Sequence, residues 1–284
     1  MGELIKGKPV ADAITLEVKV QVECLKQKGV IPKLKIVRVG EREDDLAYER
    51  AALKRMESCG IAHDVMVLPI DINQNDFIKK LKLINDDETI HGILLFRPLP
   101  KQIDEKVVKN IISPEKDIDC FNPINAAKIF EGDKTGFFPC TPTAAMEILK
   151  YYNIELKGKS AVVIGRSLVV GKPLSMMLLS EDATVTICHS KTSNLPQVAE
   201  KADILIAAIG RANMITERYI KKGATVIDVG INVDKDGNIC GDVNTEDCLK
   251  KSGFITPVPS GVGSVTTAVL AKHVIKACQM LTKN

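Results

Sequence analysis

Apolar and polar positions follow two periods along this chain, and the two periods alternate. Short runs rich in Val, Ile and Leu are typical of buried strands, and the longer segments between them have apolar residues three or four apart, as helices do. Strands are predicted at residues 35–39, 62–68, 92–96, 161–164, 184–187, 204–208, 225–229 and 254–256. Helices are predicted at residues 11–28, 44–58, 74–83, 105–111, 142–152 and 265–281. This alternation predicts an α/β fold in which helices cover parallel sheets.

A domain boundary is predicted at the sequence PCTP, residues 139–142. Its two prolines bracket a turn, and Thr141 is placed to cap a helix that begins at the second proline. The chain of 284 residues is also long for a single hydrophobic core. We therefore expect an α/β domain at residues 1–141, joined by the C-terminal helix 265–284, and a doubly wound parallel-sheet (Rossmann) domain at residues 142–264.

The segment SAVVIGRSLVVGKPLS, residues 160–175, has the pattern of a strand, a tight turn and the start of a helix. In doubly wound folds such a unit binds the phosphates of a dinucleotide, because backbone N–H groups at the helix start face the anion. Gly165, Arg166 and Ser167 form the predicted turn, with serine where the usual motif has its second glycine. The alternative interpretation is a strand-to-helix turn without a ligand.

The cofactor predicted for this turn is NADP. A site for NAD usually places Asp or Glu after the next strand, about 20 residues on, to hold the ribose 2′-hydroxyl. This chain instead has Ser190, Lys191 and Thr192 there, and all three side chains are hydrogen-bond donors. Arg166 in the turn can hold the 2′-phosphate of NADP with its forked guanidinium group. The alternative is that these are solvated loop residues.

Composition and charge exclude several other classes of protein. The formal net charge of +3 is small and dispersed, which argues against nucleic acid or a membrane surface as a partner. No apolar run approaches a membrane span, and the N-terminus lacks the apolar core of a signal peptide, so a cytoplasmic protein is expected. The eight cysteines stand singly, with no Cys/His cluster at metal-ligand spacing. No metal site is therefore predicted.

The order of motifs along the chain resembles the methylenetetrahydrofolate dehydrogenase/methenyltetrahydrofolate cyclohydrolase family. The resemblance covers essentially the whole chain and begins with Tyr48 in a helix that is followed by Gly60-Ile61. The other motifs are GILLFRPLP (92–100), KDIDCFNP (116–123), PCTP (139–142), VVIGRSLVVGKP (162–173), CHSKT (188–192), DVGIN (228–232), GDV (241–243) and TPVPSGVGSVT (256–266).

The resemblance implies two α/β domains with a cleft between them, NADP as cofactor and a homodimer formed through the Rossmann domains. It also implies hydride transfer from 5,10-methylenetetrahydrofolate to the nicotinamide, usually followed by hydrolysis of the methenyl product to 10-formyltetrahydrofolate. Asp119 matches the family's carboxylate on the pterin ring, and Tyr48 matches the tyrosine along the folate. Arg166 and Ser190 match the pair at the 2′-phosphate, and Ile231 of the DVGIN motif is a further cofactor-binding residue that the resemblance implies.

Two departures from the family pattern bear on the hydrolysis. Four residues after the tyrosine the family has a lysine that serves the proton transfers, and this chain has Ala52. Lys54 does not substitute, because two residues at about 100° each place it on the opposite side of the helix. The family's glutamine before the Leu-Pro-Leu-Pro turn, which holds that lysine, is Phe96 here. Phe96 cannot hydrogen-bond to an ammonium group or to a water.

The sequence therefore predicts a dehydrogenase with weak or absent cyclohydrolase activity. Hydride transfer depends mainly on positioning, whereas the hydrolysis needs a proton carrier. One alternative is a bifunctional enzyme in which Arg97 reaches the site, although an arginine is a poor proton shuttle and is expected to pair with a substrate carboxylate or a loop acid. Another is an inactive folate- or NADP-binding regulator. Further departures are at Cys120, Ser260 and Ser264.

Overall fold

The computed structural model describes residues 2–282, and these form two compact units. The N-terminal unit contains residues 13–138 and 267–282, and the C-terminal unit contains residues 2–12 and 139–266. The first residues thus lie in a different unit from the one expected for 1–141, because strand β1 (Glu3–Leu4) pairs with β11 (Phe254–Ile255). Residues 283–284 of the predicted C-terminal helix lie outside the described residues.

A six-stranded parallel sheet forms the centre of the C-terminal unit, in the order β1-β11-β8-β7-β5-β6. The four longer strands are β5 (Ser160–Ile164), β6 (Thr184–Cys188), β7 (Ile204–Ala207) and β8 (Thr225–Asp228). β7 and β8 are buried along their whole length, as expected of strands covered on both faces. The predicted doubly wound parallel sheet is confirmed.

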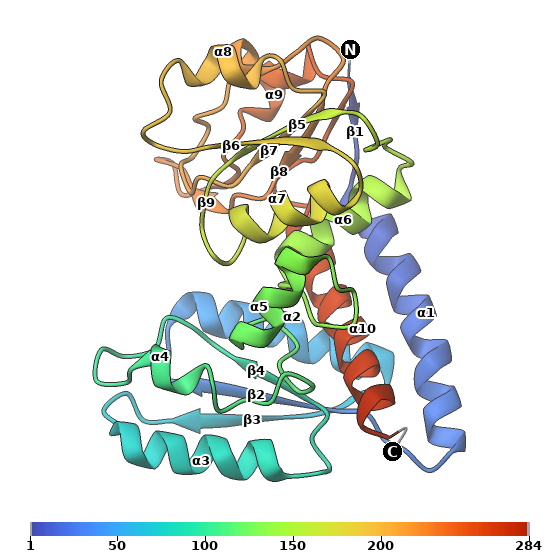
Figure 1. The fold of residues 1–284 in the computed structure, drawn as a ribbon, viewed down its shortest axis with the longest axis vertical. Coiled ribbons are helices and arrows are strands. Elements are labelled where there is room, and N and C mark those ends of the chain that lie inside the picture. Colours follow the sequence, from blue (N-terminus) through green and yellow to red (C-terminus); the bar gives the residue numbers. More distant parts are fainter. Residues whose placement is uncertain (1, 283–284) are drawn as a thin grey trace. The chain divides into compact units, whose positions relative to one another are not determined.

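Helices cover both faces of this sheet (Figure 1). Helices α6 (Cys140–Tyr151) and α7 (Gly171–Ser180) lie on one face, and α8 (Leu195–Ala199) and α9 (Thr245–Leu249) lie on the other with the short 3-10 turn η1 (Glu217–Tyr219). The predicted cap of α6 is wrong, because the helix begins at Cys140 and not at the second proline. Its N-cap is Pro139, whose carbonyl accepts a hydrogen bond from the Thr143 hydroxyl at 2.9 Å.

A small antiparallel ribbon follows β8. It consists of β9 (Asn232–Val233) and β10 (Ile239–Cys240), in which Ile239 pairs with Val233 and Cys240 with Asn232. Two-residue strands carry too few positions to show a period of two, so the sequence pattern did not predict the ribbon.

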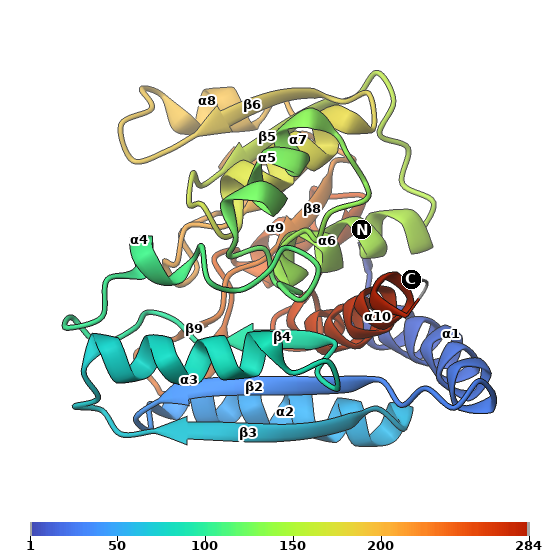
Figure 2. The same cartoon turned by 60° about the horizontal axis from the view of Figure 1, so that its bottom comes forward.

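The N-terminal unit is built on a three-stranded parallel sheet in the order β3-β2-β4. Its strands are β2 (Lys33–Val39), β3 (Ala62–Leu68) and β4 (Gly92–Leu95). Helix α3 (Gln74–Asp86) covers one face and α2 (Glu43–Cys59) the other (Figure 2). The short helices α4 (Glu105–Val108) and α5 (Pro123–Glu131) belong to the same unit, whereas α1 (Gly7–Gln27) and α10 (Gly263–Leu281) begin in the C-terminal unit and continue in this one.

Helix α2 carries a buried stripe that follows directly from its sequence. Its buried residues, Glu49, Ala52, Met56 and Cys59, stand three or four positions apart and therefore share one side of the helix. Acidic residues in the first turn suit the positive end of the helix dipole. Gly60 ends the helix in the left-handed conformation, with φ 72°, which glycine adopts without steric cost.

A buried histidine on α10 makes the stability of the N-terminal unit depend on pH. Burial lowers the pKa of His273 from 6.5 to about 4, and its Nδ1 lies 2.9 Å from the Ile118 carbonyl oxygen. Because that oxygen can only accept, Nδ1 carries the proton of the neutral ring. Between pH 6.5 and 4 the unfolded chain binds a proton that the folded chain excludes, so stability falls as the pH falls.

We expect a loss of about 3–4 kcal/mol across this range, because the pKa of His273 falls from 6.5 to about 4 and a tenfold change in proton affinity corresponds to about 1.4 kcal/mol. Urea unfolding of the wild type and of His273→Gln at pH 7, 6, 5 and 4.5 measures it. Glutamine can still donate to the carbonyl of Ile118 but does not titrate. Equal pH slopes for the two proteins would show that His273 does not carry this dependence.

Candidate functional site

The turn after β5 is shaped by Gly165. Its φ of 139° is a conformation that only glycine adopts readily, and a Cβ there would lie 2.2 Å from the carbonyl oxygen of Ala208. The Gly165 N–H donates to the carbonyl of Cys188 at 2.9 Å, which ties the turn to the end of β6. Strand, tight glycine turn and helix therefore follow one another in the structure, as the segment 160–175 predicts.

Ser167 closes this turn with its side chain. The Ser167 hydroxyl oxygen accepts from the N–H of Val170 at 3.1 Å and from that of Gly171, the first residue of α7, at 3.4 Å. Arg166, next to it, is exposed. The turn thus presents a guanidinium group to solvent just before the N-terminus of a ten-residue helix, where backbone N–H groups favour an anion.

The loop after β6 lies beside this turn. Because Ile164 pairs with Cys188 in parallel register, residues 165–167 and 189–192 leave neighbouring strands at the same edge of the sheet. The exposed Ser190 lies in that loop. The ring of His189 is used within the loop, since its Nδ1 accepts from the Lys191 N–H at 3.1 Å. This edge therefore combines Arg166, Ser190 and Lys191, and it carries no carboxylate between residues 189 and 192.

A cavity of about 250 Å³ opens at the same edge of the sheet, beyond the ends of β8 and β11. Ile231 lines it and is 67% exposed. Ser260 and Ser264, two of the departures from the family pattern, also line it; Ser260 is exposed and Ser264 is half-buried. Asp228, the last residue of β8, also lines the cavity and is buried. The cavity wall is largely apolar, which suits a flat uncharged ring system.

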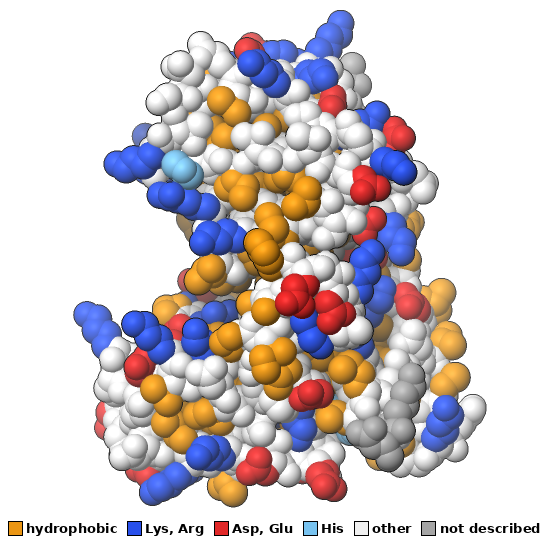
Figure 3. Space-filling model, in the orientation of Figure 1, with side chains coloured by type: hydrophobic (Ala, Val, Ile, Leu, Met, Phe, Trp, Pro, Cys, Tyr) orange, Lys and Arg blue, Asp and Glu red, His pale blue; other side chains and the backbone are white. Residues whose placement is uncertain are grey.

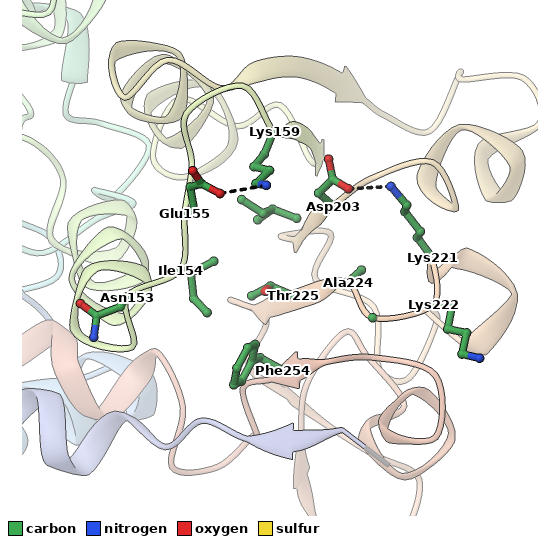
Figure 4. A pocket seen from close by; sticks show the side chains of 12 residues that line it. Asn153, Ile154, Glu155, Lys159, Asp203, Lys221, Lys222, Ala224, Thr225 and Phe254 are labelled. Atoms are coloured by element: carbon green, nitrogen blue, oxygen red, sulfur yellow. Dashed lines mark hydrogen bonds and ion pairs between the residues drawn. The ribbon is translucent and has the colours of Figure 1, made fainter.

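A second cavity, of about 330 Å³, lies at the opposite edge, where the strands of the sheet begin (Figure 4). Its charged groups are mostly satisfied by one another. Lys159 pairs with Glu155 at 2.9 Å, and Lys221 pairs with Asp203 at 2.6 Å. Ligands of open parallel sheets bind at the carboxyl ends of the strands, so we do not regard this cavity as the functional site.

The N-terminal unit brings Tyr48 of α2 together with Phe96, directly after β4. Their ring centroids lie 5.9 Å apart at an interplanar angle of 62°. This edge-to-face geometry is a favourable arrangement of two aromatic rings. Ala52, one helical turn after the tyrosine, is fully buried, whereas Lys54 is exposed on the other side of α2. The resemblance implies a lysine at position 52 and a glutamine at position 96. The structure has a buried alanine at the first and an aromatic contact with Tyr48 at the second.

Asp119 lies on a loop that a second carboxylate organises. Asp117 is buried, and it accepts hydrogen bonds from the backbone N–H groups of Phe121 at 2.9 Å and Asn122 at 2.8 Å, and from the Asn125 amide at 2.9 Å. Burial raises the pKa of the Asp117 carboxyl, and these three donors oppose the rise. The sequence pattern alone does not predict this role, because the donors lie four to eight residues after Asp117 and meet it only in the folded loop.

The loop leaves Asp119 half-buried and Cys120 in the left-handed region, with φ 58°. The resemblance implies glycine at this point, which would fit the backbone conformation better than cysteine. Burial raises the pKa of the Cys120 thiol, so the thiol is neutral at physiological pH and is no nucleophile.

Arg97 contacts an aromatic ring and no acid. Its guanidinium carbon lies 4.5 Å from the centroid of the Phe121 ring. Within residues 2–282 it makes no ion pair, so the expected pairing with a loop acid is not found. Stacking on Phe121 uses the face of the guanidinium group and leaves its N–H edge available to a ligand.

The described residues contain no group of His, Cys, Asp or Glu that could hold a metal ion. None of their helices is both long and apolar enough to cross a membrane. Figure 3 shows Lys and Arg side chains on both units with acidic and uncharged side chains among them. The candidate site residues gather at two places, the edge of the large sheet and the region around Tyr48, Phe96 and Asp119.

Comparisons with known proteins match both units to one family. Residues 139–282 match the model of the tetrahydrofolate dehydrogenase/cyclohydrolase NAD(P)-binding domain. Residues 5–119 match the model of the catalytic domain of the same family. The second model covers Tyr48, Ala52, Phe96 and Asp119, and the first covers the glycine turn and both cavities.

Full-length relatives agree with these models. The bifunctional protein FolD of Clostridioides difficile is 62% identical over 98% of this chain and 97% of its own length. The crystal structure of the FolD dehydrogenase/cyclohydrolase of Campylobacter jejuni has a TM-score of 0.96 at 40% identity, over 99% of each chain. The Trypanosoma brucei enzyme, solved with NADP and an inhibitor, has a TM-score of 0.94 at 33% identity, over 100% of this chain and 99% of that one. This chain therefore belongs to the tetrahydrofolate dehydrogenase/cyclohydrolase family.

Proposed function

We propose that the protein oxidises 5,10-methylenetetrahydrofolate to 5,10-methenyltetrahydrofolate and passes the hydride to NADP. The observation that carries this proposal is the edge of the large sheet. There the turn Gly165–Ser167, the start of α7 and the donors of the β6 loop stand beside a largely apolar cavity. The first group suits the phosphates of a dinucleotide, and the cavity suits its nicotinamide ring.

The preference for NADP rests on Arg166 and Ser190, which leave neighbouring strands at the same edge. A guanidinium group forks onto a phosphate, whereas the 2′-hydroxyl of NAD is usually held by an acid that this loop lacks. The Trypanosoma brucei relative, which was solved with NADP, supports this choice. We also place Gly165, Ser167 and Ile231 at the cofactor.

Tyr48 and Asp119 are the proposed substrate residues. The half-buried Tyr48 is held by its contact with Phe96, and Asp119 is held by the loop that Asp117 organises. A carboxylate can accept hydrogen bonds from the N–H groups of a pterin ring, and a tyrosine ring can pack along a folate. NADP accepts the hydride when bound, and Tyr48 and Asp119 would bind and orient the folate that donates it.

The cyclohydrolase activity depends on a side chain that can carry a proton. The fully buried Ala52 and the aromatic Phe96 provide no proton carrier, so we propose that hydrolysis of the methenyl product is weak or absent. The bifunctional alternative is favoured by the name of the Clostridioides difficile relative, which is 62% identical. In that case another residue of the chain serves the proton transfer.

Assembly as a homodimer through the C-terminal units also forms part of the proposal. Strand β6 is an edge strand of the large sheet, because it pairs only with β5 among the described strands. Edge strands are commonly covered by another segment. Sedimentation velocity at several protein concentrations tests this assembly.

The experiment that tests the proposed reaction follows reduction of NADP and of NAD in the presence of 5,10-methylenetetrahydrofolate. We expect turnover with NADP, and we expect Arg166→Gln to raise the KM for NADP about 10- to 100-fold while the KM for NAD changes little. Loss of a charge-assisted, bidentate contact to phosphate has an effect of about this size.

Lys201→Gln is the matched control, because Lys201 is an exposed cation in the same unit, after α8 and away from the glycine turn. It should leave both KM values unchanged. A wild type that binds NADP and folate without turnover would contradict the proposed reaction and favour the regulator. An equal rise of both KM values in Arg166→Gln would remove the role of Arg166 at the 2′-phosphate.

A further inference from the structure

Two buried carboxylates stand at the two stems of the β9–β10 ribbon. Asp228 ends β8 just before the ribbon and is 1% exposed, and Asp242 follows β10 and is fully buried. Asp228 Oδ1 accepts from the N–H of Gly230 at 3.0 Å and from that of Asp242 at 3.1 Å, and Oδ2 accepts from the N–H of Val243 at 2.9 Å. One side chain therefore binds the backbone on both sides of the ribbon.

Asp242 ties the ribbon to the loop after β7. Its Oδ2 accepts from the N–H of Ile209 at 2.6 Å and of Gly210 at 3.1 Å, and its Oδ1 accepts from the N–H of Arg211 at 2.8 Å. The same Oδ1 accepts from the Asn232 amide, on the first residue of β9, at 2.9 Å. Together the two carboxylates receive seven hydrogen bonds, six of them from backbone N–H groups.

The backbone around this pair leaves no room for a side chain at Gly241. A Cβ on Gly241 would lie 1.9 Å from Asp228 Oδ2, so no other residue fits there without displacing the carboxylate. Burial raises the pKa of Asp228 to about 7, with the N–H groups of Val243, Asp242 and Gly230 opposing the rise and the Asp242 charge adding to it. Two buried carboxylates side by side destabilise the folded protein unless their hydrogen bonds are made in full.

The segment that the pair holds carries the apolar wall of the cavity. Ile231 and Ile239 both line the cavity of about 250 Å³, one just before β9 and the other at the start of β10. Both side chains are largely exposed, at 67% and 56%, so the core of the C-terminal unit does not fix them in place. Their position depends on the stems of the ribbon, where Asp228 and Asp242 bind.

We infer that Asp228 and Asp242 are positioning residues that hold the β9–β10 ribbon against the cavity and thereby set the affinity for the nicotinamide end of NADP. The inference rests on the proposed function, which places that ring in the cavity. Neither carboxylate needs to touch the cofactor for this effect, because each acts through the backbone of the ribbon. An ordered apolar wall binds a ring more tightly than a mobile one, since less ordering is needed on binding.

The test compares two ligands that share only one end of the cofactor. The variants Asp228→Asn and Asp242→Asn keep the side-chain shape but place an NH₂ group against backbone donors. We expect the dissociation constant of NADP to rise at least about 10-fold in each, while that of 2′,5′-ADP stays within about twofold. The fragment contains the adenosine 2′-phosphate but no nicotinamide, so a local loss at the ribbon does not affect it.

Asp236→Asn is the matched control, because Asp236 is exposed in the turn between β9 and β10 and lies on the same ribbon. It should leave both dissociation constants unchanged. The inference is overturned if Asp228→Asn and Asp242→Asn bind NADP as the wild type does, or if they lose NADP and 2′,5′-ADP to the same degree. A wild type that fails to bind NADP at all would instead overturn the proposed function.

Hydrogen exchange on the wild type keeps the inference testable if either variant fails to fold. The amides of Ile209, Arg211, Gly230 and Val243, which donate to the two carboxylates, should exchange far more slowly than the amide of Lys235 between the strands of the ribbon. Addition of NADP should slow exchange along the ribbon further. Exchange at the four amides as fast as at Lys235 would show that the pair does not hold the ribbon.

Discussion

The double variant Ala52→Lys/Phe96→Gln should hydrolyse 5,10-methenyltetrahydrofolate about 10²- to 10⁴-fold faster than the wild type, after the uncatalysed rate has been subtracted from both. This is the range by which a positioned general acid or base accelerates a reaction. The wild type has no ionisable side chain at either position, and the two rings of Tyr48 and Phe96 are in edge-to-face contact there. Decay of the methenyl absorbance, with and without enzyme, measures the effect.

Both substitutions are needed, because Ala52 is fully buried and Phe96 offers no hydrogen-bond acceptor. Ala52→Lys alone would place an ammonium group at a fully buried position, beside the Tyr48–Phe96 contact and without a hydrogen-bond acceptor from Phe96. Burial of an unpaired charge lowers the pKa of the amine or destabilises the fold. Phe96→Gln supplies an amide oxygen that can accept from the ammonium group. We therefore expect the single variants to gain far less than the double variant.

Lys54→Met is the control on the same helix. Lys54 is exposed, two positions after Ala52 and on the other side of α2, so its removal should change neither activity. NADP reduction with 5,10-methylenetetrahydrofolate reports whether each variant still binds folate. If the wild type already accelerates methenyl decay as much as the double variant does, the bifunctional alternative is correct and the proton carrier lies elsewhere, with Arg97 the next residue to substitute.

The long elements and the cofactor turn could be predicted from the sequence for a simple reason. Strands β5, β7 and β8 are buried almost throughout, so they read as apolar runs that end in glycine or polar turns. Gly165 was predictable because its position, between a strand and a helix, requires a backbone that only glycine adopts. The motif order along the chain then predicted the family, which the comparisons confirm, and the candidate substrate residues.

The features that could not be predicted from the sequence are very short elements and contacts between residues that are distant along the chain. The two residues of β1 carry no period, and only their pairing with β11 assigns the start of the chain to the C-terminal unit. Asp117 and Asp242 belong to motifs that the sequence analysis recognised, but their roles require the loops they bind to be folded. The sequence does not show whether Arg97 contacts an acid or an aromatic ring. In the folded loop it stacks on the ring of Phe121.

Loss of the carboxylate at Glu49 should destabilise the N-terminal unit by about 3–5 kcal/mol. Glu49 follows Tyr48 on α2, and its Oε2 lies 2.8 Å from Nε of Arg38 on β2. Both side chains are largely buried, with 8% of the Arg38 side chain and 12% of the Glu49 side chain exposed. Removal of one partner from a buried ion pair leaves the other charge without compensation, and losses of this size result.

The partner that remains determines how the test is designed. Arg38 also donates to the carbonyl of Gly40 at 2.5 Å, but a carbonyl does not neutralise its charge. In Glu49→Leu the buried guanidinium group keeps only a 3.9 Å contact with the carboxylate of Glu41, which is 76% exposed and therefore compensates the charge weakly. In the double variant Arg38→Met/Glu49→Leu the buried pair is gone and an apolar contact replaces it. Because such replacements are often neutral, we expect the double variant to be more stable than Glu49→Leu alone.

Urea unfolding of the wild type, the two single variants and the double variant gives the coupling free energy of the pair. Glu57→Gln, an exposed carboxylate on the same helix, should change the free energy of unfolding by less than about 0.5 kcal/mol. Strictly additive losses in the cycle would mean that Arg38 and Glu49 do not stabilise each other. If the double variant loses less stability than the two single variants together, Arg38 and Glu49 stabilise each other and thereby fix α2 on β2. The position of Tyr48 depends on that contact, because Tyr48 precedes Glu49 on the same helix.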